Sequence, residues 1–307
     1  MSGSRRSHCL DFPQKLCRLG KEARSGASSS ARMLRSRRVK MSVEEFHRQP
    51  FRLGWKLEYL RGHLVETPRQ VMAYATIPVA PRPAIAPVAL RLAVPTDEQV
   101  LLPCFVAAFR NAFEFCDYGR DQFVKAAREC LRYVFSQPNS RWAPASLVAL
   151  GAPGTRQAGK PIGAALVLLQ TDCAFLDAVF VAPSFQRRGL ATALVTASIN
   201  ALFKLSSYRR LVSRYLVGNE PSRAWHRRFG FKEEPDLQLA QLYARAASRE
   251  LVRLRELGER SLDRQSQLEA DCAHWQAEVS RLEALLDEGR ESEAYSWHKW
   301  KLSEGSD

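Results

Sequence analysis

The segment from Val181 to Ala191 has residue types and a spacing that suit it to binding an anion. It follows the largely apolar run from Phe175 to Phe180 and reads Val-Ala-Pro-Ser-Phe-Gln-Arg-Arg-Gly-Leu-Ala. A strand that stops at a proline and enters a helix through a short basic loop directs backbone N–H groups outward at the helix N-terminus. These unpaired donors and the positive end of the helix dipole favour a diphosphate. A nucleotide-type cofactor is therefore the first hypothesis.

Two well-known phosphate-binding loops do not fit this segment. No Gly-Lys-Ser/Thr follows it, which excludes a Walker loop, and it contains only one of the three glycines of the dinucleotide fingerprint G-x-G-x-x-G. An ordinary strand-to-helix turn with solvated arginines explains so short a string equally well. The surrounding elements must therefore decide between an anion site and an ordinary turn.

The elements around the loop predict an α+β fold. Their order is a strand, two amphipathic helices, three apolar strands, the helix after the loop, a further strand and a last helix before Gly230. This order is typical of a mixed, mostly antiparallel central sheet with helices on both faces. The last strand is expected to splay from its neighbour and open a cleft beside the loop. The expected strands cover residues 90–94, 146–150, 162–169, 174–181 and 211–217, and the helices begin near residues 96, 121, 188 and 219.

A second motif lies on the last of these helices, over residues 219–231, and reads Asn-Glu-Pro-Ser-Arg-Ala-Trp-His-Arg-Arg-Phe-Gly-Phe. Together with the loop, this helix resembles two motifs of the GNAT superfamily of acyl-CoA-dependent N-acetyltransferases. Those motifs are V-x-P-x-x-Q/R-x-x-G-x-G/A and N-x-x-A-x-x-x-Y-x-x-x-G-F, in the same order. The resemblance covers about residues 88–232. It implies a GNAT-like fold, with acetyl-CoA as the acyl donor and no metal.

The resemblance also implies a site for coenzyme A on the loop and on the neighbouring strand edge. Gly189 and Ala191 would let the backbone approach the diphosphate, and Arg187 and Arg188 would add countercharge. In this family the splayed strand edge hydrogen-bonds the pantetheine arm as it would an added strand. The residues implied to bind the cofactor are Val179, Phe180, Val181, Gln186, Arg187, Arg188, Gly189, Leu190, Ala191, Thr192 and Asn219.

Two residues are candidates for the catalytic proton transfers. Asp177 lies four residues before Val181, where many members of the family place a glutamate base, and strand alternation would put it on the same face as Val179. A solvated or capping aspartate is the alternative. His226 occupies the position at which the family usually has the tyrosine that protonates the leaving thiolate. A histidine can donate a proton near neutral pH, or it can be a helix residue without a chemical role.

The chain before the GNAT-like region predicts a small accessory module. A capping-box pattern at residues 42–45 opens a short helix, and a turn at Arg61 and Gly62 joins two alternating segments into a β-hairpin. Residues 71–77 are expected to add a third strand, before a proline-rich segment. The module would pack on the transferase or present Trp55, Tyr59 and Arg69 to its cleft.

The chain after Phe231 departs from the resemblance. The family normally finishes with another strand or hairpin, which often shapes the acceptor side, whereas here residues 232–235 lead into a helix. The acceptor therefore cannot be inferred by analogy. Further on, a heptad seam with a break at Gly258 predicts either a helical hairpin that covers its own domain or an arm that pairs with a second subunit. The seam residues are Leu268, Cys272, Trp275, Val279, Leu282 and Leu286.

Composition and charge limit the remaining interpretations. The net charge is +14, but residues 1–40 alone carry eleven Lys or Arg and two acidic residues, so the rest of the chain carries only +5. The basic tail would allow weak nucleic-acid contact that is not sequence-specific. No apolar run reaches the length of about 18 residues that suggests a membrane span. Seven scattered cysteines without a CxxC pair make a disulfide framework or a zinc site unexpected and favour a cytoplasmic location.

Three functions follow from these observations. The first is transfer of an acetyl group from acetyl-CoA to a primary amine of a small molecule or protein. The second is a catalytically silent acyl-CoA-binding module, and the third is a nucleic-acid-associated factor that acts through the basic tail. The expected organisation is a disordered tail (1–40), a β module (41–78), a proline-rich linker (79–87), a GNAT-like domain (88–235), a helical, coiled-coil-like extension (236–290) and a second tail (291–307).

Overall fold

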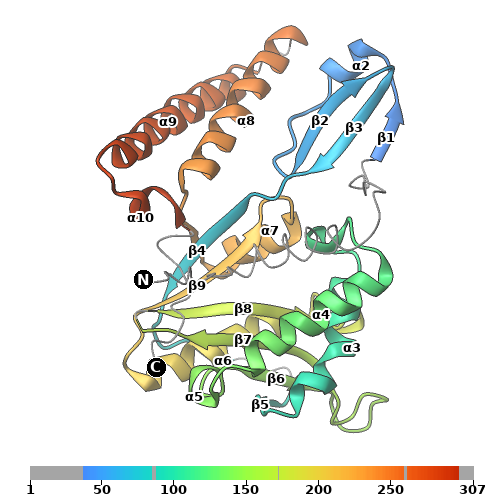
Figure 1. Ribbon diagram of the computed structural model, residues 1–307, viewed down its shortest axis with the longest axis vertical. Helices are drawn as coiled ribbons and strands as arrows, with labels where there is room; N and C mark the ends of the chain where they lie inside the picture. The colour runs from blue at the N-terminus through green and yellow to red at the C-terminus, as the bar shows by residue number, and fades with distance from the viewer. Residues whose placement is uncertain (1–36, 85–87, 172, 259–260, 297–307) are drawn as a thin grey trace, which may run out of the picture.

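The computed structural model describes residues 37–84, 88–171, 173–258 and 261–296 of the 307-residue chain. Figure 1 shows a central sheet with helices packed against it, a small N-terminal β module, and C-terminal helices on the same side of the molecule as that module. The basic tail expected before residue 37 and the last residues, from 297 on, lie outside the described residues. None of the helices in the described ranges is long and apolar enough to cross a membrane.

The central sheet is mixed and mostly antiparallel, which confirms the fold class predicted from the sequence. Its strand order is β10-β4-β9-β8-β7-β6-β5, and each neighbouring pair is antiparallel except β8 with β9. The strands are β4 (Met72–Pro78), β5 (Leu90–Leu92), β6 (Leu147–Leu150), β7 (Pro161–Leu169), β8 (Ala174–Val181), β9 (Arg210–Leu216) and β10 (Lys232–Glu233).

Helices cover both faces of this sheet. One apolar core lies between the strands and α3 (Asp97–Phe109), α4 (Arg120–Phe135) and α5 (Asn139–Trp142). The other lies between the strands and α6 (Leu190–Leu205), α7 (Glu220–Phe229) and α8 (Leu237–Glu256). The strand β7, which has a neighbour on both sides, is buried over nearly its whole length, which explains why its sequence is a continuous apolar run without alternation.

Strands β8 and β9 pair over their first halves and then diverge. Their parallel register ends with Leu176 opposite Ser213. On its other edge β8 stays paired with β7 as far as Val181 opposite Gly163. The edge of β8 beyond Leu176 is therefore open toward β9 in the described residues, which agrees with the predicted splay.

The strand expected to complete the accessory module belongs to the central sheet instead. β4 pairs antiparallel with β9 from Met72 opposite Leu216 to Pro78 opposite Arg210. The expected boundary after residue 78 therefore does not separate the module from the sheet. Local periodicity predicted the strand correctly, but its partner lies more than a hundred residues later in the chain, and periodicity carries no information on such a pairing.

A short strand also follows Phe231, where the sequence predicts that the chain leads directly into a helix. In β10, Lys232 lies opposite Thr76 and Glu233 opposite Ala75 of β4. The two strands together extend the sheet beyond β9. The sheet therefore continues beyond β9 through β4 and the two-residue strand β10, on the side where the sequence predicts that the last strand is missing.

The N-terminal module is a three-stranded sheet of order β1-β3-β2, with β1 (Arg37–Lys40), β2 (Trp55–Leu60) and β3 (His63–Pro68). The sequence predicts that residues 37–40 belong to the disordered tail, but they pair antiparallel with β3. Between β1 and β2 the short helix α2 (Val43–His47) has the predicted capping box, in which the Ser42 hydroxyl accepts a hydrogen bond from the Glu45 N–H at 3.1 Å.

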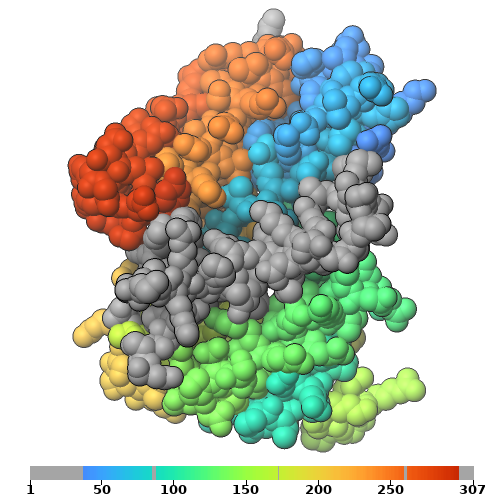
Figure 2. Space-filling view, in the orientation of Figure 1, coloured from blue at the N-terminus to red at the C-terminus, as the bar shows by residue number. Residues whose placement is uncertain are grey.

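The module contacts the central domain beside the turn that follows β9. A Cβ atom on Gly54 would lie 2.2 Å from the Cα atom of Gly218, so the two backbones touch directly. The Trp55 ring packs edge-on against Phe113, with 5.3 Å between ring centroids. On its other side the module lies beside α8, as the adjoining blue and orange atoms of Figure 2 show. Residues of both, including Trp55 and Arg249, line a shared groove.

The C-terminal helices form an antiparallel hairpin within this chain. The heptad seam of α9 (Leu262–Asp287) packs on α8: Leu268 joins Ala247 and Leu254, while Val279 and Leu282 join Leu237. α8 ends just before Gly258, whose φ is +65°, and α10 (Glu291–Ala294) follows the hairpin. The heptad seam of α9 is therefore covered by α8 of the same chain, which agrees with the predicted helical hairpin.

Candidate functional site

The loop after β8 is held in shape by its own backbone and by one side chain. A 3₁₀ turn, η2 (Pro183–Phe185), is followed by Arg187 at φ +59° and Gly189 at φ +79°. The Gln186 Nε2 donates a hydrogen bond to the carbonyl oxygen of Val181 at 3.0 Å, so this side chain closes the loop. Apart from its neighbours in the chain, no atom of the described residues lies within 4 Å of the place where a Cβ of residue 189 would be. The positive φ, rather than lack of space, therefore requires glycine there.

Helix α6 begins at the end of this loop without a side-chain cap. The first N–H groups of a helix have no partner within the helix and point out of its end. They face a cavity of about 650 Å³, called here the outer cavity. Much of the predicted cofactor set lines it: Val181, Gln186, Arg187, Gly189, Leu190, Ala191 and Thr192.

Two further segments complete the outer cavity. Trp225, Arg228 and Phe229 come from α7, which carries the second motif, and Arg82 and Pro83 come from the proline-rich segment that follows β4. The predicted cofactor residue Arg188 is exposed and packs its guanidinium over the Phe185 ring instead. The outer cavity thus combines open backbone donors with several arginines, an arrangement suited to a phosphorylated ligand.

A second cavity, of about 120 Å³, lies where β8 and β9 diverge and is called here the inner cavity. Aromatic and aliphatic side chains of α3, α4 and the strands make up most of its wall. Val179 lines the inner cavity and Val181 lines the outer one, so the open edge of β8 runs from one cavity to the other. Phe180, between them, points away into the core against Phe105. The polar residues that line the inner cavity are Glu114, Asp177, Ser213, Arg214, Asn219, Ser222 and His226.

Asp177 does not lie on the face that strand alternation predicted. The pairing of β7 with β8 shifts by one residue between Leu166 and Val167, and Asp177 is left in the resulting β-bulge. Val179 therefore packs toward the α6 side, whereas Asp177 lies near Cys130 of α4 on the opposite side. The expectation that Asp177 and Val179 share a face is wrong because a bulge interrupts the period of two.

Asp177 forms a buried ion pair with Arg214 of β9. Its Oδ1 lies 3.7 Å from the Arg214 Nη2, and the two side chains are 2% and 7% exposed. Burial raises the pKa of Asp177 to about 6, although the positive charge of Arg214 acts in the opposite direction. The pair thus spans the splay between β8 and β9, and burial raises the pKa of its carboxyl group.

Glu114 is a site residue that the sequence reasoning missed. It lies on the 3₁₀ turn η1 (Phe113–Phe115) between α3 and α4 and lines the inner cavity. Asn219 Nδ2 donates a hydrogen bond to its Oε1 at 2.6 Å, while its buried Oε2 has no hydrogen-bond partner in the described part of the chain. Burial raises the pKa of Glu114. No motif or periodicity marks this residue, because its role depends on a contact across 105 positions in the sequence.

Asn219 occupies the inner cavity rather than the outer one. Its Oδ1 accepts a hydrogen bond from the Ser222 N–H at 3.0 Å and caps α7, while its amide nitrogen holds Glu114. The first residue of the second motif therefore connects the start of α7 to the wall formed by η1.

His226 is buried, and both of its ring nitrogens have partners. Nδ1 lies 2.8 Å from the backbone oxygen of Ser222, which can only accept, so Nδ1 carries the proton and Nε2 accepts from the Ser213 hydroxyl, also at 2.8 Å. Burial lowers the pKa of His226 to about 4. The imidazole is therefore neutral at pH 7, with no proton on the nitrogen that faces Ser213. The acid role of His226 stays a prediction, and this geometry gives it no support.

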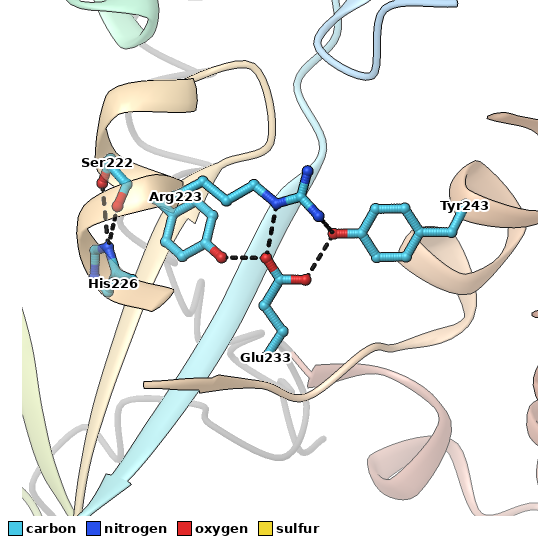
Figure 3. A network of polar contacts seen from close by, with 6 residues as sticks. Ser222, Arg223, His226, Glu233 and Tyr243 are labelled. Atoms are coloured by element: carbon cyan, nitrogen blue, oxygen red, sulfur yellow. Dashed lines mark hydrogen bonds and ion pairs between the residues drawn. The ribbon is translucent and has the colours of Figure 1, made fainter. Parts of the chain in front are cut away.

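A polar network next to His226 connects α7 to the C-terminal helices (Figure 3). Glu233 of β10 accepts hydrogen bonds from Arg223 at 3.0 Å, from Tyr243 of α8 at 2.7 Å and from Tyr215 of β9. Burial alone would raise the pKa of Glu233, but these three donors together hold it below its usual value. The network fixes the helix of the second motif against both the sheet and α8.

The part of the chain that contains both cavities matches a known family. Residues 112–231 match the acetyltransferase (GNAT) family. This region of the chain is a GNAT acetyltransferase domain. The match begins just before Glu114 and ends at Phe231, so it includes the loop, both splayed strands and α7. β4, Arg82 and the C-terminal helices lie outside the matched residues.

Solved structures similar to this chain include several GNAT proteins. A GCN5-related N-acetyltransferase from Sphaerobacter thermophilus is 16% identical over 53% of this chain and 48% of its own, with a TM-score of 0.41. The PaiA N-acetyltransferase from Thermoplasma acidophilum, in complex with coenzyme A, is 13% identical over 47% of this chain and 89% of its own, with a TM-score of 0.38. AAC(6')-Iy, in complex with a bisubstrate analogue, is 22% identical over 48% of this chain and 92% of its own, with a TM-score of 0.35.

The similarity of these structures covers only part of the molecules concerned. The alignment spans about half the length of the Sphaerobacter structure. No curated protein sequence matches the chain. The assignment of the GNAT domain therefore rests on the family match over residues 112–231 and on the arrangement of the loop, the splayed strands and α7 described above.

Proposed function

We propose that this protein transfers an acetyl group from acetyl-CoA to a primary amine, by direct attack of the amine on the thioester. The observation that supports the proposal most strongly is the continuity of the open β8 edge between the two cavities. A donor whose diphosphate lies at the start of α6 would pass its pantetheine arm along Val179 and Val181. Its thioester would then reach the inner cavity, next to the carboxylates.

The residues of the inner cavity support roles in proton transfer. A primary amine has to lose a proton to become a nucleophile, and a carboxylate with a raised pKa is suited to accept it. Glu114 is our first candidate for this base, because it lines the cavity with a free carboxylate oxygen and is oriented by Asn219. Asp177 is the second candidate, but its carboxylate is already paired with Arg214.

The leaving group does not need an acid from the protein. A thiol has a pKa near 8.5, so a thiolate is a stable leaving group close to neutral pH. A neutral His226, with its proton on Nδ1, would instead orient Ser213 on the wall of the cavity. Acetyl transfer then depends mainly on the alignment of amine and thioester.

The same site supports a second proposal, an acyl-CoA-binding module without catalysis. It requires only the outer cavity and the β8 edge, and it would leave Glu114 and Asp177 as structural residues. Nucleic-acid binding through residues 1–40 is a third proposal, which rests on their net charge of +9 alone.

A thiol-release assay with acetyl-CoA separates these proposals. The protein is tested against polyamines, amino acids, aminoglycosides, aromatic amines and N-terminal peptides, and acetylated products are identified by mass spectrometry. Acetylation of at least one amine supports the enzyme. Tight binding of acetyl-CoA without any product across the panel would favour the silent module.

A further inference from the structure

The proline-rich segment after β4 is fixed against the GNAT domain at Arg82. The Arg82 N–H donates to the Asn200 Oδ1 at 2.8 Å, and the Asn200 Nδ2 donates to the Arg82 carbonyl oxygen at 2.9 Å. A short distance before, the Val79 N–H donates to the carbonyl oxygen of Arg209 at 2.9 Å. Prolines on either side of Arg82 restrict the backbone further. Arg82 is therefore held in place on α6 by both of its backbone polar groups.

The side chain of Arg82 lies across the outer cavity's aromatic wall. Its guanidinium is 5.0 Å from the centroid of the Phe229 ring, and Phe229 in turn stacks on Trp225 with 5.2 Å between ring centroids. All three residues line the outer cavity together with the loop. A segment that precedes the family match thus contributes a cation to the same cavity as the loop that follows β8.

Two buried donors of this wall have no acceptor among the described residues. They are the Arg82 Nε and the Trp225 indole Nε1. A buried N–H without a partner destabilises a fold unless a ligand or water satisfies it. Among the described residues that line the cavity none carries a carboxylate, whereas Arg82, Arg187 and Arg228 carry guanidinium groups. This wall therefore carries unpaired N–H donors and positive charge, and no anionic side chain among the described lining residues balances them.

We propose that Arg82 and Trp225 form a second phosphate subsite for the acyl-CoA donor, on the wall formed by the proline-rich segment and α7. The inference rests on the proposed use of acyl-CoA. Coenzyme A carries a diphosphate and a 3′-phosphate on its ribose, and both have the same chemistry for these donors. The open N–H groups of α6 and the loop serve the first phosphate site, so an additional subsite would let this chain hold a donor with two separate phosphorylated groups.

Binding measurements on two conservative variants test the subsite. Dissociation constants for coenzyme A, dephospho-coenzyme A and 4′-phosphopantetheine are measured by calorimetry for the wild type, Arg82→Gln and Trp225→Phe. We expect Arg82→Gln to weaken coenzyme A binding on the order of tenfold, as for loss of a charge-assisted hydrogen bond. Trp225→Phe keeps the ring and removes only the N–H, so it should weaken binding less, by about threefold.

The three ligands identify which phosphate is bound. If the subsite holds the 3′-phosphate, Arg82→Gln weakens coenzyme A but leaves dephospho-coenzyme A unchanged. If it holds the diphosphate, the variant weakens coenzyme A and dephospho-coenzyme A equally. Arg156→Gln, in the exposed turn between β6 and β7, serves as the matched control and should bind all three ligands like the wild type. Arg82→Lys retains a cation on Phe229 and keeps the test informative if the glutamine variant unfolds.

The result that would overturn the subsite differs from the one that would overturn the enzyme. The subsite alone would be refuted if Gly189→Glu abolishes coenzyme A binding while the Arg82 and Trp225 variants bind within about twofold of the wild type. The loss of either donor must lower the affinity if the subsite exists. A wild-type protein that does not bind coenzyme A at all would refute the proposed function. Asn200→Ala, which releases the segment but keeps its charge, should weaken binding less than Arg82→Gln does.

Discussion

The outer and inner cavities of this molecule are built in opposite ways. The outer cavity is formed mainly by a contiguous loop, the start of α6 and part of α7, with Arg82 and Pro83 beside them, and the two sequence motifs together contain most of its lining. The inner cavity is assembled from α3, η1, α4, β4, β7, β8, β9 and α7, and the Asp177 side chain and the Oε2 atom of Glu114 are buried in it. The donor side can therefore be read from a short string of residues, whereas the chemistry next to it depends on long-range contacts.

The largest effect is expected from a substitution that removes coenzyme A binding at the outer cavity and leaves the inner cavity intact. Gly189→Glu places a side chain and a negative charge at a position whose φ of +79° suits glycine, at the start of α6. We expect coenzyme A binding to weaken more than about a hundredfold, because repulsion and backbone strain act together. Calorimetry measures this directly.

Gly154→Glu is the matched control for that change. Gly154 has a φ of +78°, and the described residues other than its chain neighbours also leave the position of its Cβ open, but it lies in the turn between β6 and β7. Its substitution should strain the backbone equally and leave the affinity unchanged. A similar loss of affinity in both variants would mean that general destabilisation, and not the cofactor site, explains the result.

The inner cavity is tested by Glu114→Gln. Removing a general base typically lowers turnover by about 10²- to 10⁴-fold, so we expect kcat to fall by at least the lower figure while coenzyme A affinity stays the same. Steady-state kinetics with the amine found in the thiol-release assay provide the measurement. Glu283→Gln, on the exposed side of α9, should have no effect. If Asp177→Asn lowers kcat more than Glu114→Gln does, the base is Asp177 and our order of the two carboxylates is wrong.

How far the sequence predicts each cavity follows from the contacts involved. The boundaries of β8 and the turn into α6 could be predicted because proline, glycine and a continuous apolar run are local signals. The bulge at Asp177 could not, since a bulge changes the pairing with β7 without a distinctive residue type. Glu114 between two phenylalanines has no periodic context, and its partner Asn219 is far away in the sequence. The place of β4 in the sheet was missed for the same reason.

A smaller effect concerns the pH dependence of stability through His226. Its pKa in the folded protein, about 4, lies below the value of 6.5 for an unperturbed histidine. The unfolded chain therefore binds a proton between these two values while the folded chain does not, so stability is full above pH 6.5 and falls as the pH drops toward 4. Between pH 7.5 and pH 5 this one group should reduce the free energy of unfolding by about 2 kcal/mol.

Urea unfolding of the wild type and His226→Gln at both pH values tests this expectation. The variant loses stability at pH 7.5, because the buried partners Ser213 and Ser222 lose part of their hydrogen bonding. Its stability should then change less with pH than that of the wild type. Equal pH dependence in both proteins would show that His226 is not the buried neutral group described above.

The smallest effect is expected at the network that joins the GNAT domain to α8. Tyr243→Phe removes one donor to Glu233 and the hydroxyl that accepts a hydrogen bond from Arg223 Nη2 at 3.0 Å, and it leaves the ring in contact with Trp275. We expect the free energy of unfolding to fall by about 1 to 2 kcal/mol, as for two net hydrogen bonds at a partly exposed site, with unchanged coenzyme A affinity. Denaturant titration measures the first and calorimetry the second. A loss of affinity without a loss of stability would mean that α8 acts on the cofactor site directly.

The most direct test of the central claim, that one donor molecule joins the two cavities along β8, is a crystal structure of Glu114→Gln with coenzyme A. We predict the diphosphate at the N–H groups of residues 190–192, the pantetheine arm along the edge of β8 at Val179 and Val181, and the thiol in the inner cavity near residue 114. Coenzyme A bound with its thiol outside the inner cavity, or bound away from β8, would contradict the account.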